Sequence, residues 1–245
     1  MNKLSLVLFI MFMKVDSRFR SSGTPEDYVI RMKVPVKNVG RMVLKSVIMP
    51  KSMYPVIAGW NDVIDYDIGG GATTRTITSG RNYTGAQLAA ELTTQLAAGP
   101  ITYSSNTGKL TFGTTPATLL LEQTTTPAFA YVLGYEPGSG SIAQPTGQVD
   151  LTYPRWLRLA VDVNNLDVGG QCQDTTKQFS YNFQFNNSQW GEIESWTQDE
   201  TYVQRDPISD INVQDIHVKW TMPDDALALD LEGIDHQIVF QVFGV

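Results

Sequence analysis

The amino-acid sequence predicts an all-β protein: an antiparallel sandwich with a small α+β insertion and an extended N-terminal arm. Three observations predict this fold. Roughly eight stretches alternate apolar and polar residues or are short β-branched runs, and turn signals separate them. Only 18% of the 245 residues are charged, and Thr, Asn, Gln and Gly take their place, as is typical of β-rich proteins. Residues 71–147 differ in texture, being rich in Thr and holding the one clear helix pattern.

Residues 1–23 are expected to form the arm. Leu4–Met13 is an apolar run behind Lys3 that is too short for a membrane-spanning helix. It has the basic-then-apolar pattern of a signal peptide, but no small-x-small cleavage site follows. We therefore expect an uncleaved arm that packs on a partner or touches a membrane, and whose removal leaves a folded body. Residues 13–20 alternate in character, which predicts a strand with one buried face.

Residues 24–70 and 148–245 are expected to form the sandwich. In the strand expected over Ile211–Trp220, the alternation of apolar and polar residues shifts by one position between Val213 and Ile216, which predicts a bulge. The final strand is largely apolar on both faces and is expected to be central. The expected strands are Tyr28–Pro35, Arg41–Ile48 (after a turn at Lys37–Gly40), Val63–Ile68, Trp156–Val163, Phe179–Phe185, Gly191–Thr197, Ile211–Trp220 and Gln237–Phe243.

Residues 71–147 are expected to form the inserted α+β subdomain. Thr84 and Gln87 have the spacing of a capping box, and an apolar stripe of Leu88, Leu92 and Leu96 follows, which predicts a helix. Glycine-rich segments at both ends suit a unit that leaves a sheet and rejoins it. The other expected elements are a hairpin of Ile101–Ser104 and Lys109–Phe112, a strand at Thr118–Glu122, a short helix at Pro127–Leu133 and a linker at Pro137–Gly147.

Charge is distributed unevenly along the chain, whose net charge is −7. Residues 1–50 carry nine Lys or Arg and three Asp or Glu, a net of +6, whereas the remainder carries nine and twenty-two, a net of −13. The negative net charge of the whole chain argues against a protein that binds nucleic acid through its overall charge. The basic segment suits a polyanion, an anionic lipid or an acidic neighbouring copy. Alternatively its charges are solvated strand faces, because they alternate with apolar residues.

Few residues are candidates for metal binding. The single cysteine, Cys172, excludes an intrachain disulfide and a zinc site of several cysteines. Both histidines, His217 and His236, are expected to be structural. A group of carboxylates in the last quarter could suggest calcium, but EF-hand spacing is absent, and solvated turn carboxylates are the favoured interpretation. That group comprises Asp224, Asp225, Asp230, Glu232 and Asp235.

Catalytic patterns are weak. No phosphate-binding glycine loop or G-x-S-x-G elbow is present, and no spacing brings Ser, His and Asp together. Four carboxylates near Trp190 and Trp196 could serve a glycosidase, or more readily a lectin-like sugar site, which needs no tuned pKa. They are Glu192, Glu194, Asp199 and Glu200. Sequons at Asn82 and Asn186 matter only in a secreted protein. No catalytic, cofactor or metal site is expected.

Four stretches together carry a family resemblance. They are Asp16–Tyr28 (DSRFRSSGTPEDY), Val43–Tyr54 (VLKSVIMPKSMY), Gly80–Thr84 with Leu133–Tyr135, and Ile216–His236. In this order they resemble penton (vertex) and minor capsid proteins of Polinton-like viruses, virophages and nucleocytoplasmic large DNA viruses. In the first stretch Tyr28 stands where those proteins usually have Phe, and the apolar Leu4–Met13 run departs from their pattern.

The resemblance implies an antiparallel jelly-roll sandwich and a structural role in a virion, with no catalytic residues or cofactor. As the penton of an icosahedral double-stranded DNA virus, the chain would form a homopentamer at the capsid vertex. Expected partners are neighbouring major capsid proteins, genome or internal membrane through the basic arm, and a host receptor or fibre through residues 71–147. The alternatives are a minor cement or fibre-associated attachment protein and, in a different class, a carbohydrate-binding or glycosidase sandwich.

Overall fold

The computed structural model describes most of the chain and divides it into two compact units, residues 1–52 with 155–245 and residues 53–154. Predictions for Cys172, Asn186, Asp199, Glu200, Asp224 and Asp225 lie outside the described residues, as do parts of the Leu4–Met13, Thr118–Glu122 and Pro137–Gly147 segments. The described residues are 9–67, 69–96, 99–113, 118–119, 127–135, 144–152, 154, 156–164, 177–185, 190–197, 206–222 and 229–244.

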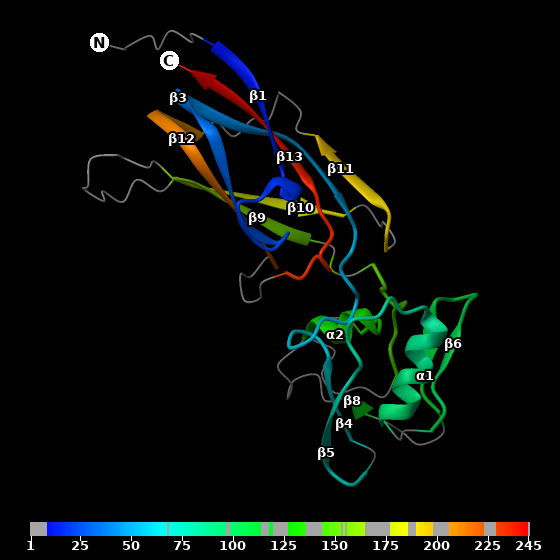
Figure 1. Ribbon diagram of the computed structural model, residues 1–245. Helices are drawn as coiled ribbons and strands as arrows, with labels where there is room; N and C mark the ends of the chain where they lie inside the picture. Colours follow the sequence, from blue (N-terminus) through cyan, green and yellow to red (C-terminus); the bar gives the residue numbers. More distant parts are fainter. Residues whose placement is uncertain are drawn as a thin grey trace, which may run out of the picture. The chain divides into compact units, whose positions relative to one another are not determined.

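The first unit is one antiparallel sheet that curls on itself (Figure 1). Its main path runs β1-β13-β3-β12-β9-β10, and β2 and β11 both pair with β3. The strands are β1 (Phe9–Asp16), β2 (Ser22–Gly23), β3 (Asp27–Pro50), β9 (Trp156–Asn164), β10 (Lys177–Gln184), β11 (Ile193–Thr197), β12 (Asp206–Thr221) and β13 (Gln237–Gly244). This is the all-β antiparallel jelly roll that the sequence predicts.

The long strands β3 and β12 allow the sheet to curl. The first half of β3 pairs with β2 and β12, and its second half pairs with β13 and β11 as well as with the start of β12. A strand that changes partners along its length bends from one layer of a sandwich into the other. The core enclosed in this way includes Tyr28, Leu44, Val161, Trp220 and Phe240, all fully buried.

The turn expected at Lys37–Gly40 is wrong, because β3 is continuous through it. Asn38 has a φ of 54°, a left-handed conformation that Asn tolerates better than most residues. Its backbone N–H donates to the Asn212 side chain of β12, 3.3 Å away, where the pairing of the two strands shifts register. The residue therefore makes a bulge in a paired strand. The bulge expected between Val213 and Ile216 is confirmed by the same register shifts.

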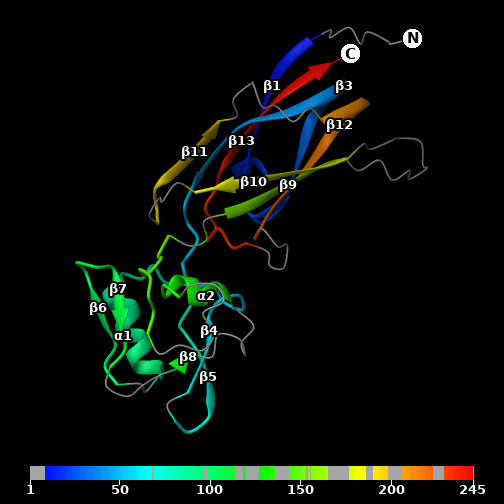
Figure 2. The ribbon, with the colours of Figure 1, turned by 180° about the vertical axis from the view of Figure 1, so that it is seen from behind.

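The N-terminal segment is a strand of the sheet itself. β1 pairs with β13 from Phe9 opposite Gly244 to Asp16 opposite Gln237, which makes β13 central as predicted (Figure 2). The strand expected over residues 13–20 instead ends at Asp16 and continues as a 3₁₀ turn, Ser17–Phe19. The Asp16 side chain ends the strand by accepting the Arg18 backbone N–H. The alternation over residues 13–20 predicts Phe19 on the buried face with Met13 and Val15, but because the strand ends at Asp16, Phe19 is 74% exposed.

The second unit has its own core of buried residues, which includes Leu88, Leu92 and Leu96 on one helix and Phe129 and Val132 on another. It is wider than the expected insertion, because the strand around residue 65 pairs within this unit and not with the jelly roll. Its elements are β4 (Val63–Asp67), β5 (Ala72–Thr76), α1 (Gly85–Leu96), β6 (Thr102–Ser104), β7 (Lys109–Thr111), β8 (Thr118–Leu119) and α2 (Pro127–Val132).

The predicted helix and hairpin of this unit are confirmed. The Thr84 backbone N–H donates to Gln87 Oε1 at 2.9 Å, and the Gln87 N–H donates to Thr84 Oγ1 at 3.3 Å. This reciprocal pair is a capping box and fixes the start of α1. β6 and β7 pair around the predicted turn at residues 105–108.

Candidate functional site

The first and last resemblance segments meet in space. We call this cluster the clasp: Ser17, Arg20, Tyr28, Trp220, Asp235 and His236. Ser17 Oγ donates to Asp235 Oδ1 at 2.7 Å and accepts the backbone N–H of His236 at 3.0 Å. Arg20 Nη1 lies 3.0 Å from the same Asp235 oxygen. The clasp thus ties the turn after β1 to the segment that leads into β13.

The centre of the clasp is a buried, neutral histidine. Trp220 Nε1 donates to His236 Nε2 at 2.9 Å, and the Tyr28 hydroxyl lies 3.1 Å from the same nitrogen. An indole N–H can only donate, so this nitrogen is an acceptor. Burial lowers the pKa of His236 to about 4. Burial also raises the pKa of Tyr28 well above its ordinary value, so that both groups are uncharged at neutral pH.

The structure brings a serine, a histidine and an aspartate together, but not as a hydrolytic triad. A triad needs the serine hydroxyl on a ring nitrogen of the histidine. Here the Ser17 hydroxyl bonds to the Asp235 carboxylate and to the His236 backbone. The histidine nitrogen that could act as a base accepts the Trp220 N–H instead. The clasp therefore holds strands together and has no nucleophile–base pair.

Several basic residues of the N-terminal fifth have carboxylate partners in the same chain. Arg18 binds buried Asp16 through two hydrogen bonds, of 2.9 and 2.6 Å, and these lower the pKa of that carboxyl. Arg31 on β3 makes a similar two-point pair with Asp215 on β12, at 2.9 and 3.1 Å. The first pair lies within the basic segment, and the second joins that segment to the acidic remainder across neighbouring strands.

An apolar surface lies along β1, at one margin of the sheet. Ile10 is 57% exposed and Phe12 is 65% exposed, with the partly exposed Met11 between them. Ile10 faces Phe243 across the strand pair, and the Arg41 guanidinium lies over the Phe243 ring at 4.6 Å. Within the described residues β1 pairs only with β13, so its other edge is unpaired. An unpaired edge with large apolar side chains favours association with another chain.

The residues proposed for a glycosidase or lectin site serve packing. Trp190 Nε1 donates to the Ser52 carbonyl at 3.0 Å, and Trp196 packs edge-on against the buried Phe183 ring, with centroids 5.1 Å apart. Glu194 is partly buried on β11, and Glu192 precedes that strand on the surface. Each tryptophan therefore has a structural contact of its own within the first unit.

The remaining candidates have structural contacts. His217 Nε2 lies 2.5 Å from Asp27 and its Nδ1 lies 3.4 Å from Asp162, on the strands to either side. Asp230 accepts the backbone N–H of Glu232 in a turn. Among the described residues, no three His, Cys, Asp or Glu side chains group as metal ligands would. Likewise, no helix in that part of the chain is long and apolar enough to cross a membrane.

Comparison with known proteins shows a likeness in fold and none in sequence. No protein-family model matches the sequence, and no curated protein sequence matches it. The crystal structure of selenomethionine-labelled mavirus penton protein superposes with a TM-score of 0.56, covering 97% of this chain and 100% of that one. The chain shares its fold with that protein. Sequence identity is 10%, so the likeness establishes the fold and not the role.

The sequence alone does not predict which distant side chains contact each other, nor where the surface is hollowed. It singled out His236 and Asp235 separately and noted the stretch from Asp16 to Tyr28, but nothing in the sequence pairs them. The sequence also gives no sign of the pocket beside α1 in the second unit, although Asn82 and Gln87, which line it, stand out for a sequon and a capping box. The basic-residue spacing on β3 was visible, whereas its acidic counterpart on β12 could be matched only once the two strands were paired.

Proposed function

We propose that the protein is a structural virion protein, the vertex capsomer (penton) of an icosahedral double-stranded DNA virus, and acts as a homopentamer without enzymatic activity. The observation that supports this is the fold: the jelly roll and its companion unit are similar to the mavirus penton protein along nearly all of both chains. The four resemblance segments, read in order, support the same assignment.

The exposed edge of β1 supplies a contact for assembly. A ring of five identical copies needs a heterologous interface, in which one patch meets a different patch on the next copy. A β-edge is well suited, because its free backbone groups and side chains can add to a neighbour's surface. We assign Ile10 and Phe12 to that interface.

Further partners follow from the same proposal. Neighbouring major capsid proteins would surround the pentamer at the vertex. The basic N-terminal arm would contact the genome or an internal membrane, and the exposed Lys33 and Lys37 on β3 could add to that contact. The second unit would face a receptor or fibre.

Native mass spectrometry of the purified protein tests the proposal, with a five-fold multiple of 27.2 kDa expected. Phe12→Glu should dissociate the pentamer, because it places a charge in an apolar contact. Val34→Glu is the matched control, because it changes a strongly exposed apolar residue of β3 instead of β1. It should leave the mass of the oligomer unchanged. A trimer would favour a cement or fibre-associated protein, and a wild-type monomer at all concentrations would contradict the assignment of β1.

A further inference from the structure

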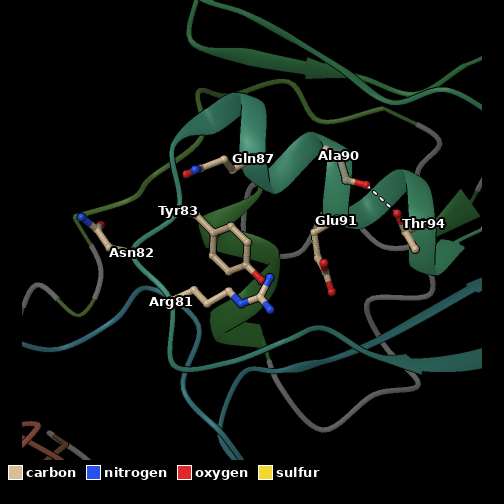
Figure 3. A pocket seen from close by; sticks show the side chains of 7 residues that line it. All are labelled: Arg81, Asn82, Tyr83, Gln87, Ala90, Glu91 and Thr94. Carbon is tan, nitrogen blue, oxygen red and sulfur yellow. Dashed lines mark hydrogen bonds between the residues drawn. The ribbon is translucent and has the colours of Figure 1, made fainter.

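The second unit has a concave pocket of about 310 Å³ beside α1 (Figure 3). Residues on one stripe of the helix, Gln87 and Glu91 among them, form one wall. The segment that leads into the helix, Arg81–Tyr83, forms the other. The leucine stripe of α1 faces the core, so the helix uses a separate polar face for this pocket. The volume is at the lower end for small-molecule sites, which run from about 300 to 1,000 Å³.

Internal hydrogen bonds hold the pocket walls in place. The Tyr83 ring is 5% exposed, and its hydroxyl donates to the Thr78 carbonyl at 2.6 Å. Glu91 Oε1 accepts from the Thr78 hydroxyl at 2.7 Å and from Gln95 at 3.1 Å. The bond from Thr78 lowers the pKa of Glu91, so this carboxylate is ionised at neutral pH. The Tyr83 and Glu91 side chains are therefore ordered before a ligand binds, which reduces the entropy that binding costs.

Three planar polar groups at the pocket have no hydrogen-bond partner within the described chain. They are the Arg81 guanidinium, the Asn82 amide and the amino group of Gln87, whose oxygen is used by the capping box. Figure 3 shows Arg81 and Asn82 on the segment that faces the helix. These groups can all donate hydrogen bonds to a ligand, and Glu91 provides an acceptor beside them.

The charge and shape of the site select the ligand class. Arg81 and Glu91 balance each other, so the pocket has no net charge to attract a phosphate or other anion. A ring with several hydroxyls can accept from amides and guanidinium and donate to a carboxylate at the same time. We propose that this pocket binds one neutral hexopyranose unit of a glycan.

Sugar binding here is separate from assembly, and its test is separate too. The full-length protein, made in bacteria so that Asn82 is unmodified, is mixed with methyl pyranosides of glucose, galactose, mannose and N-acetylglucosamine. Binding is measured by saturation-transfer NMR and titration. At least one pyranoside should bind, and Arg81→Ala with Asn82→Ala should weaken it at least tenfold. Neither side chain has a hydrogen bond within the described chain, so the double variant should keep its circular dichroism spectrum.

Matched controls locate the signal. Arg75→Ala and Asn106→Ala change the same residue types at exposed positions of the same unit and should bind as wild type. Trp190→Ala tests the other proposed sugar site and should also bind as wild type. Three results would overturn the proposal: no pyranoside binding at tens of millimolar, binding that survives the Arg81–Asn82 double change, or inorganic phosphate binding in place of sugar.

Discussion

His236 couples the stability of the protein to pH. Burial lowers its pKa from 6.5 to about 4 in the folded protein. Between these values the unfolded chain binds a proton that the folded chain excludes, so the free energy of unfolding decreases as pH falls. The loss should reach up to about 3 kcal/mol near pH 4. Urea unfolding at several pH values between 7 and 4 measures it.

The control for this pH effect is His236→Gln, which keeps a polar side chain but cannot titrate. Glu26 and Glu232, whose pKa values burial raises, titrate with the opposite effect in both proteins. The informative quantity is therefore the difference between the wild type and the variant. That difference should change with pH only below about 6.5, the ordinary pKa of histidine. Parallel stability curves for the two proteins would show that His236 is protonated or exposed in the fold.

At the level of elements, β1 should be essential to the stability of the jelly roll. Met13 and Val15 are buried by its pairing with β13. Deleting residues 1–15 should lower the free energy of unfolding by about 3 kcal/mol or more, from loss of these two side chains alone. This reverses the expectation that the arm can be removed without harm to the body. Phe12→Glu, which would dissociate the proposed pentamer but keeps Met13 and Val15, is the matched comparison. The deletion should be less stable than this variant, and equal stability of the two would contradict the pairing.

Local elements are the ones that the sequence predicts best. The capping box of Thr84 and Gln87 and the leucine stripe of α1 depend only on residues three to eight apart, and all are confirmed. The prediction of a turn at Lys37–Gly40 is wrong because the same residue types suit either a hairpin turn or a bulge. The choice depends on β12, which lies far along the chain and pairs with both halves of β3.

At the level of the whole molecule, the second unit should fold alone. Its core cluster is drawn entirely from residues between Val56 and Leu151, within the 53–154 unit. A protein of residues 53–154 should show a helical circular dichroism signal and one cooperative urea transition. Leu92→Ala removes a fully buried side chain and should destabilise it by about 2–5 kcal/mol. A non-cooperative transition in the parent fragment would contradict an independent core.

Contacts that join distant parts of the chain could not be predicted. The clasp joins Ser17 to Asp235, which is 218 positions away, and Tyr28 to His236, 208 positions away. Each residue type is common, and no periodicity relates them. The resemblance marked both stretches, but only the paired strands show that they meet. The same is true of Arg31 and Asp215. Arg31 belongs to the basic segment and Asp215 to the acidic remainder, and only the pairing of their strands shows that they form an ion pair.

The pairing of β1 with β13 also sets the order of events during synthesis. β1 is the first strand of this sheet to leave the ribosome and β13 is the last. Met13 and Val15 must therefore wait, without their native partner, until all the other strands have been made. A chain in this state exposes apolar side chains and a free edge, the features that chaperones recognise in incomplete folds. Completion of the sheet is thus a step that follows the synthesis of β13, and we expect protection of the first strand until then to limit aggregation.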